Sequence, residues 1–278
     1  MLTPRGAAGT SLTQLVYSRE RVLYGVMVVV SLGVYAGLGM WALSQPEIGA
    51  RILVYAIMIP LLGWYTHGVA LGRVRGNAVR VSDKQFPELY RLTVAHARQL
   101  DLKEVPMVYV LQSGGLLNAF ATRFSRRDFV VINSDVLELA LDQGEAAVGF
   151  IVGHELAHLW RGHLRHRWLT TPARFVPYLG SAYSRACEYT CDRIGAACQP
   201  DGAISGLLAL AAGKQLHPHV DVREFAAQAE KDQSYWTRRA ELISSHPLLT
   251  KRVAALLKAG ISIPARRHLP MAGAQAAA

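Results

Sequence analysis

The residues with the clearest chemical potential form the sequence His154-Glu155-Leu156-Ala157-His158, which fits the pattern HExxH. The apolar stretch around it predicts a helix over 142–160. Residues four apart share a helix face, so both histidines can direct an imidazole at one metal ion while Glu155 reaches a metal-bound water. Zinc suits this donor set and lowers the pKa of that water towards about 7, so Glu155 can take its proton as the oxygen attacks a peptide carbonyl.

A structural helix whose histidines only hydrogen-bond would also match the pattern. The rest of this helix consists mainly of Ala, Val, Ile, Leu and Gly. Burying two imidazoles and a carboxylate there would be costly without a partner such as a metal ion. Metal binding is therefore the favoured interpretation.

A catalytic zinc needs a third protein ligand and keeps its fourth position for water. One protease pattern places a histidine six residues after the second one, and it fails because that position is Leu164. Glu188 offers a carboxylate on a later predicted helix, and Asp192, one turn further on, could accept the other ring hydrogen of a ligand histidine. Cys187 and Cys191 are alternative ligands, although thiolates are more typical of a closed structural site.

Two uncharged apolar segments precede these motifs, and each is long enough to cross a bilayer as a helix. Arginines flank the pair on its outer sides at positions 5, 19, 21, 73, 75 and 80, against one at position 51 between the segments. By the positive-inside rule, both outer ends face the cytoplasm. We expect a multi-pass protein of the cell's inner membrane, with a cytoplasmic N-terminal segment (1–21), a transmembrane hairpin (22–72, spans 22–43 and 52–72), a cytoplasmic catalytic domain (73–260) and a disordered tail (261–278).

Composition narrows the function further. The chain has 278 residues, 51% of them hydrophobic, which excludes a disordered chain and a miniprotein held together by disulfides. Its net charge of +10 is partly explained by arginines beside the spans, where anionic lipid attracts them, so we expect no nucleic-acid partner. Three cysteines within 187–198 favour a reducing compartment. The glycines of 206–214 lack the spacing of a phosphate loop, so we expect no nucleotide.

The remaining patterns predict an α+β fold that is mostly helical. Short β-branched or aromatic runs predict strands at 105–111, 118–122 and 129–132. Apolar residues at helical spacing predict a helix over 86–100, and the chain from 135 onward is mostly helical in pattern. The expected architecture is thus two N-terminal transmembrane helices followed by a domain with a small β-sheet.

Four short motifs give this chain a family resemblance. They are Asn118-Ala119-Phe120-Ala121, Gly153 to His158, Glu188 to Asp192, and Ser245-His246-Pro247 with Arg252 following. Together they resemble the HtpX-like membrane zinc metallopeptidases of the gluzincin type, distant relatives of the prenyl-protein endoproteases, over residues 76–257.

This resemblance implies a zincin-like catalytic domain in which each chain binds one zinc ion. The ligands would be His154, His158 and Glu188, and Glu155 would be the general base. Asp192 would orient a ligand, and His246 would stabilise the oxyanion. The stretches around Asn118 and 130–133 would be edge strands that align an extended polypeptide substrate by strand addition. The implied substrate-binding residues are Asn118, Ala119, Val131 and Asn133.

One departure from the family concerns the segment between the two ligand helices. HtpX-type members carry additional apolar spans there, whereas 159–187 contains five arginines and no span fits. His163 and His166 stand among these arginines, so we expect them on a solvated basic face without a catalytic role.

The leading hypothesis is a membrane-anchored zinc endopeptidase whose partners are polypeptide substrates and the lipid bilayer. The alternative is a membrane-tethered scaffold with structural zinc, against which the intact Glu155 argues. An intramembrane protease is disfavoured because Asp142, Glu145 and Arg161 bracket a stretch too short to cross a bilayer. The sequence leaves the oligomeric state and the natural substrate open.

Overall fold

The structure is a computed structural model, and it describes residues 11–112, 114, 118–143, 145–165 and 167–265. Two long helices lead the described chain, α1 (Ser18–Ser44) and α2 (Pro46–Asn77), and both are long and apolar enough to cross a membrane. The predicted spans lie within them. The predicted eight-residue link is reduced to Gln45, because Pro46 suits the first turn of a helix and α2 begins there.

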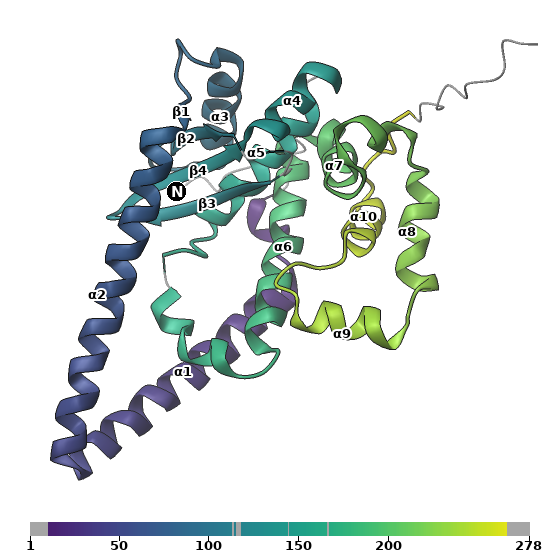
Figure 1. The fold of residues 1–278 in the computed structure, drawn as a ribbon. Coiled ribbons are helices and arrows are strands. Elements are labelled where there is room, and N and C mark those ends of the chain that lie inside the picture. The colour runs from purple at the N-terminus through teal and green to yellow at the C-terminus, as the bar shows by residue number, and fades with distance from the viewer. Residues whose placement is uncertain (1–10, 113, 115–117, 144, 166, 266–278) are drawn as a thin grey trace, which may run out of the picture.

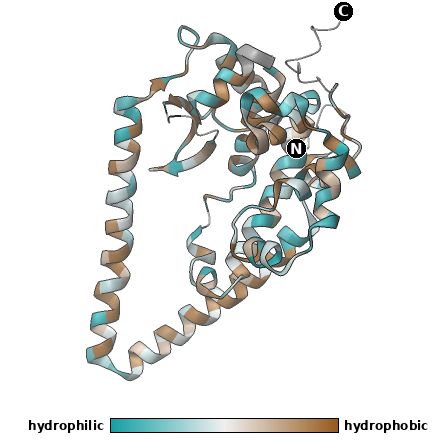
Figure 2. Cartoon of the chain, turned by 45° about the vertical axis from the view of Figure 1, so that its right-hand side comes forward, coloured by the Kyte–Doolittle hydropathy of each residue, from teal (hydrophilic) through white to brown (hydrophobic). Residues whose placement is uncertain are grey.

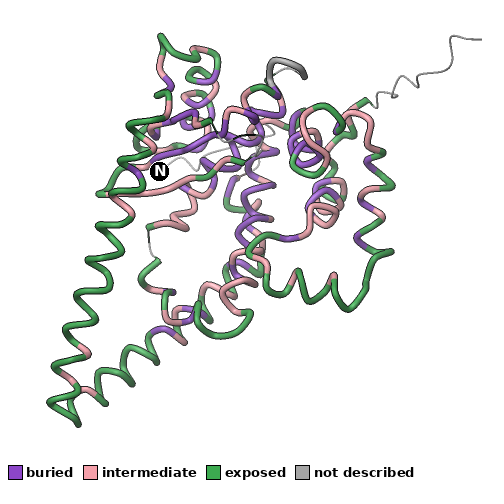
Figure 3. The backbone as a smooth tube through the Cα atoms, in the orientation of Figure 1, coloured by how far each residue is buried: buried purple, intermediate pink, exposed green. Residues whose placement is uncertain are grey.

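The two helices meet at one end and diverge towards the rest of the molecule (Figure 1). Most of their apolar side chains are exposed, as the brown colouring in Figure 2 and the green tube in Figure 3 show. In water, such a surface would be an unusually large uncovered apolar patch. Its extent therefore fits helices whose surroundings are lipid.

A four-stranded mixed sheet lies at the diverging end of α2 (Figure 1). Its strands are β1 (Val79–Arg80), β2 (Met107–Leu111), β3 (Ala119–Phe124) and β4 (Arg127–Asn133), in the order β1-β2-β4-β3. Ser125 and Arg126 both take positive φ in the two-residue turn between β3 and β4, as in the tight turns that suit strand twist. The three predicted strands are therefore confirmed.

The order of these strands corrects one expectation. β4 pairs in parallel with β2 and antiparallel with β3, so residues 130–133 lie on an internal strand and their predicted edge position is wrong. The two-residue β1 and the six-residue β3 stand at the two ends of the sheet, so β3 offers the longer outer edge for strand addition.

Eight further helices complete the described fold. They are α3 (Pro87–Gln99), α4 (Ser134–Gln143), α5 (Glu145–Trp160), α6 (Leu179–Cys198), α7 (Ala203–Leu216), α8 (Val222–Lys231), α9 (Tyr235–Ile243) and α10 (Leu249–Lys258). The predicted helix over 142–160 begins later, at Glu145, because residues 142 and 143 end α4. Of the tail expected to be disordered, 261–265 forms no helix or strand and 266–278 lies outside the described residues.

The central helix is α5, which is buried along most of its length against the sheet, α4, α6 and α7. It crosses α6 at two glycines. A Cβ atom on Gly153 would lie 3.2 Å from the Cα of Gly195, and one on Gly195 would lie 3.0 Å from the backbone nitrogen of His154. The backbones of the two helices are therefore in direct contact where the HExxH motif begins.

This contact leads to a prediction for Gly195→Val. The new side chain would meet the backbone of α5, which cannot rotate away, so we expect a loss of about 1–3 kcal/mol in the free energy of unfolding. Denaturant unfolding of the detergent-purified chain would measure it. Gly76→Ala is the control, since a Cβ at Gly76 meets no atom within 4 Å. Equal stability of the two variants would contradict the close crossing.

Candidate metal centre

The HExxH motif lines a cavity of about 270 Å³. Ala119, Phe120 and Ala121 of β3 form one wall, and α5 supplies His154, Glu155 and His158. The opposite wall comes from α6 with Tyr183, Ser184, Cys187 and Glu188, and His246 approaches from the loop between α9 and α10. The predicted metal ligands and base therefore line the same cavity as the outer strand β3.

Three donor groups converge in this cavity. The Nε2 atom of His154 lies 3.4 Å from Oε2 of Glu188, and the Nε2 atom of His158 lies 3.4 Å from Oε1 of the same carboxylate. The three ligand atoms lie within 4.8 Å of one another. Ligands placed about 2.0–2.1 Å from a tetrahedral zinc ion are themselves about 3.3–3.4 Å apart. The donor set thus has the chemistry and the spacing that a zinc ion requires, whereas 3.4 Å is long for a hydrogen bond.

Two other groups of side chains in the described residues could also hold a metal ion. One combines His158, His163 and Cys191, and the other combines Glu20, His163 and Cys187. Neither includes both histidines of the motif. Burial raises the pKa of both thiols, which disfavours the thiolate that binds metals.

Asp192 contacts the Nδ1 atom of His154, and Arg252 in turn contacts Asp192. Asp192 Oδ1 lies 3.0 Å from Nδ1 of His154, so the ring donates there and directs its Nε2 towards Glu188. Arg252 donates to both oxygens of Asp192, at 2.8 Å from Nε and 2.6 Å from Nη2. Burial opposes ionisation of Asp192, but Arg252 and His154 together outweigh it and lower the pKa of that carboxyl. Sequence analysis placed Arg252 in a family motif without giving it a role.

Glu155 and Glu188 differ in electrostatics although both are buried. Burial raises the pKa of Glu155, and the two motif histidines offset this only in part. Burial acts on Glu188 as well, but the neighbouring His154 and His158 and the charge of Arg252 lower its pKa. The backbone of Ala121 also lowers the pKa of Glu155, but by less than burial raises it. Glu155, whose carboxyl readily takes a proton, thus lies beside Glu188, whose carboxyl stays ionised. Glu155 is on α5, which contacts β3.

His246 lies at the rim of the cavity with 63% of its side chain exposed. Its Nε2 is 3.5 Å from Oε1 of Glu188, and its Nδ1 is 3.0 Å from the hydroxyl of Ser245. The ring therefore faces the donor set while remaining accessible to a substrate.

The residues expected to contact substrate divide into two groups. Ala119 lines the cavity, and Asn118 immediately precedes β3, where its carbonyl accepts a bond from the N–H of Asn133. Val131 and Asn133 are buried on the internal strand β4. A paired internal strand cannot add a further strand, so these two residues are not retained as substrate contacts.

His163 corrects a second expectation, because it is not on a solvated face. Its side chain is 8% exposed, with Nδ1 at 3.0 Å from Nδ1 of His158 and Nε2 at 3.1 Å from Glu20. Arg161 also donates to Glu20, at 2.6 Å from Nη2. One feature of the sequence could have indicated this contact: Glu20 is the single acidic residue before the first span. His166 lies outside the described residues.

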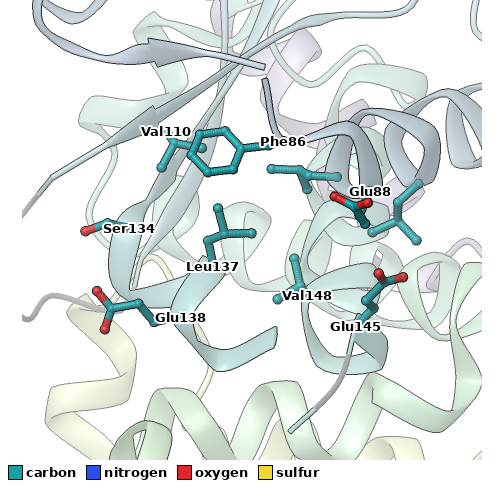
Figure 4. Close-up of a pocket in the computed structure, with 10 residues that line it drawn as sticks. Phe86, Glu88, Val110, Ser134, Leu137, Glu138, Glu145 and Val148 are labelled. Carbon is teal, nitrogen blue, oxygen red and sulfur yellow. The ribbon is translucent and has the colours of Figure 1, made fainter. Parts of the chain in front are cut away.

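A second cavity, of about 470 Å³, lies on the other side of α5, between α3, α4 and the end of β2 (Figure 4). Figure 4 shows Phe86, Val110, Leu137 and Val148 in its walls, with glutamates around them. The described residues that line it include no histidine or cysteine. The HExxH motif lines the smaller cavity instead.

The ion pair of Arg252 leads to a prediction for Arg252→Met. The change leaves the buried Asp192 without its cation, so we expect a loss of about 3–5 kcal/mol in the free energy of unfolding at pH 7. The pKa of Asp192 is lower in the folded state, so the stabilisation is complete above the unfolded value of about 3.9 and is lost as the pH falls through the folded value.

The difference between variant and wild type should consequently shrink below about pH 4. Urea unfolding of the detergent-purified chains at a series of pH values would measure it. Arg223→Met, at an exposed position on α8, is the control. A variant as stable as this control at pH 7 would refute the importance of the pair.

Comparison with known proteins agrees with this geometry. The profile of peptidase family M48 matches residues 83–174 and 168–259, which together make up more than half of the chain. The matched region contains the HExxH motif, Glu188, Asp192, His246 and Arg252. No curated protein matches the chain. The chain belongs to peptidase family M48, the zinc-dependent family that includes the HtpX type, and it is a metallopeptidase.

Proposed function

We propose that this chain is a membrane-anchored zinc endopeptidase that binds one zinc ion through His154, His158 and Glu188. The observation that carries the proposal is the pair of 3.4 Å separations between the histidine Nε2 atoms and the two oxygens of Glu188. Glu155 stands beside this set on the same helix, in a cavity bordered by an outer strand. These are the parts that hydrolysis of an extended polypeptide requires.

Each side chain has a separate task in the proposed mechanism. Zinc, when bound, would activate water and polarise the substrate carbonyl. Glu155 takes a proton from the attacking water and delivers it to the leaving nitrogen, a task suited to its raised pKa. Asp192, held by Arg252, fixes the ring of His154. His246 donates a hydrogen bond to the oxygen on which negative charge develops.

The substrate would lie along the outer edge of β3. Ala119 to Ala121 line the cavity together with the proposed base, Glu155. An extended peptide that pairs with this edge would pass over Glu155 in a fixed register. Asn118 and Ala119 remain the proposed substrate contacts.

The membrane anchor is proposed to be the hairpin of α1 and α2. Both helices are long and apolar enough to cross a membrane, and both have their arginine-rich ends at the catalytic domain (Figure 1). Positive charge at these ends favours a cytoplasmic domain attached to the inner membrane. The scaffold alternative is not favoured, because a purely structural zinc has no need of Glu155 beside an open cavity.

The base assignment leads to a prediction for Glu155→Gln. The amide cannot accept the proton, so we expect hydrolysis of an unfolded model protein to fall by about 10²–10⁴-fold while the zinc content stays at one per chain. Peptide release and metal analysis of detergent-purified chains would measure both. Glu230→Gln, exposed on α8, is the matched control.

Undiminished hydrolysis by Glu155→Gln would refute its role as base. Chelation separates the enzyme from the scaffold alternative. We expect a chelator to remove activity with little unfolding and added zinc to restore it, whereas a structural zinc would take the fold with it.

The position of His246 leads to a prediction for His246→Ala. Loss of a donor to the developing oxyanion should lower kcat by about 10²–10³-fold with little change in KM. Zinc content should be unchanged, and His246→Gln, which keeps a donor, should recover part of the activity. A parallel loss of zinc would instead identify His246 as a metal ligand.

A further inference from the structure

The segment between α5 and α6, residues 167–178, packs against the middle of α1. The backbone N–H of Ala173 donates to the hydroxyl of Ser31 at 3.1 Å, and the hydroxyl of Tyr35 donates to the carbonyl of Trp168 at 2.8 Å. Ser31 and Tyr35 lie well inside the span 22–43, about 14 and 20 Å along the helix from Val22 at 1.5 Å per residue. The connecting segment therefore lies alongside a part of α1 assigned to the membrane.

The exposed residues of the connecting segment are mainly apolar or aromatic, apart from Arg167, Thr171 and Arg174. Trp168 is 62% exposed and Phe175 84% exposed, and Val176 and Tyr178 are exposed as well. Thr170 and Ala173 are buried. Four large apolar or aromatic side chains within eleven residues thus extend the uncovered apolar surface of α1, beside which the segment runs (Figure 1).

The polar groups of the segment are compatible with lipid around it. Two 3₁₀ turns, 167–170 and 172–175, provide internal backbone bonds, and the hydroxyls of Thr170 and Thr171 both donate to the carbonyl of Arg167. Backbone groups in a bilayer must be satisfied in this internal way. Arg167 and Arg174 line the cavity of the metal centre, so their side chains reach the polar cavity from the segment.

We propose that residues 168–178 are inserted in the bilayer, with Trp168, Phe175 and Val176 among the acyl chains and Tyr178 nearer the headgroups. Tyrosine, with its polar tip, prefers that boundary. One wall of the active-site cavity is then formed by a membrane-embedded segment. The inference rests on the proposed membrane anchoring, and it explains how a segment too short and too charged to span the bilayer still follows α1 into it.

Site-specific labelling tests the proposal. Single cysteines replace Phe175, Leu38 on the exposed face of α1, and Leu216 at the exposed end of α7, in a chain carrying Cys198→Ala. The other two native cysteines are buried. Each cysteine carries an environment-sensitive fluorophore, and the full chain is reconstituted in phosphatidylcholine and phosphatidylglycerol vesicles. Quenching by nitroxide-labelled phospholipid is compared with quenching by aqueous iodide.

We expect lipid nitroxide to remove most of the fluorescence at Phe175 and Leu38, with little effect of iodide, and the reverse at Leu216. Iodide quenching at Phe175, with Leu38 quenched by lipid, would overturn the insertion and leave the anchoring intact. Protection of Phe175 from both quenchers would overturn it in favour of a covering protein surface. A Leu38 label quenched by iodide would refute the anchoring itself. Circular dichroism of each labelled chain confirms that it is folded.

Discussion

The proposed metal centre depends on the direct backbone contact between α5 and α6. The motif histidines and the carboxylate of Glu188 come from different helices, and a carboxylate reaches both Nε2 atoms only because the helix axes approach closely at Gly153 and Gly195. A side chain at either glycine would separate the axes. The same contact buries the ionisable groups, so their charges must be balanced inside the protein.

That balance is achieved by giving each buried charge a defined partner. Arg252 neutralises Asp192, Asp192 holds His154, and His154 faces Glu188. Burial dominates the pKa of Glu155, whereas His154, His158 and Arg252 together lower the pKa of Glu188. Two glutamates thus receive opposite pKa shifts from their surroundings, and this separates the proposed proton acceptor from the proposed metal ligand.

Local patterns predicted those parts of the structure that local physics determines. Helical spacing identified the face that carries His154 and His158, and the length of the apolar runs identified α1 and α2. Strand order was not predictable in this way, because a parallel pairing of β2 with β4 carries no signature within either strand. Two further contacts join segments more than 130 residues apart, namely that of His163 with Glu20 and that of 167–178 with α1. The periodicity of a sequence does not predict contacts over such separations.

The hairpin is attached to both sides of the cavity. α1 packs on α6 and on residues 167–178, while α2 contacts β3 through a bond between His67 and Thr122 and a stacking of Trp64 on Phe124. The two helices join at Gln45, at the end remote from the cavity (Figure 1). The two helices thus join at one end and contact opposite sides of the cavity at the other. In the proposed membrane-anchored state, a bilayer that changes their tilt would apply a mechanical load to both walls of the proposed substrate cavity.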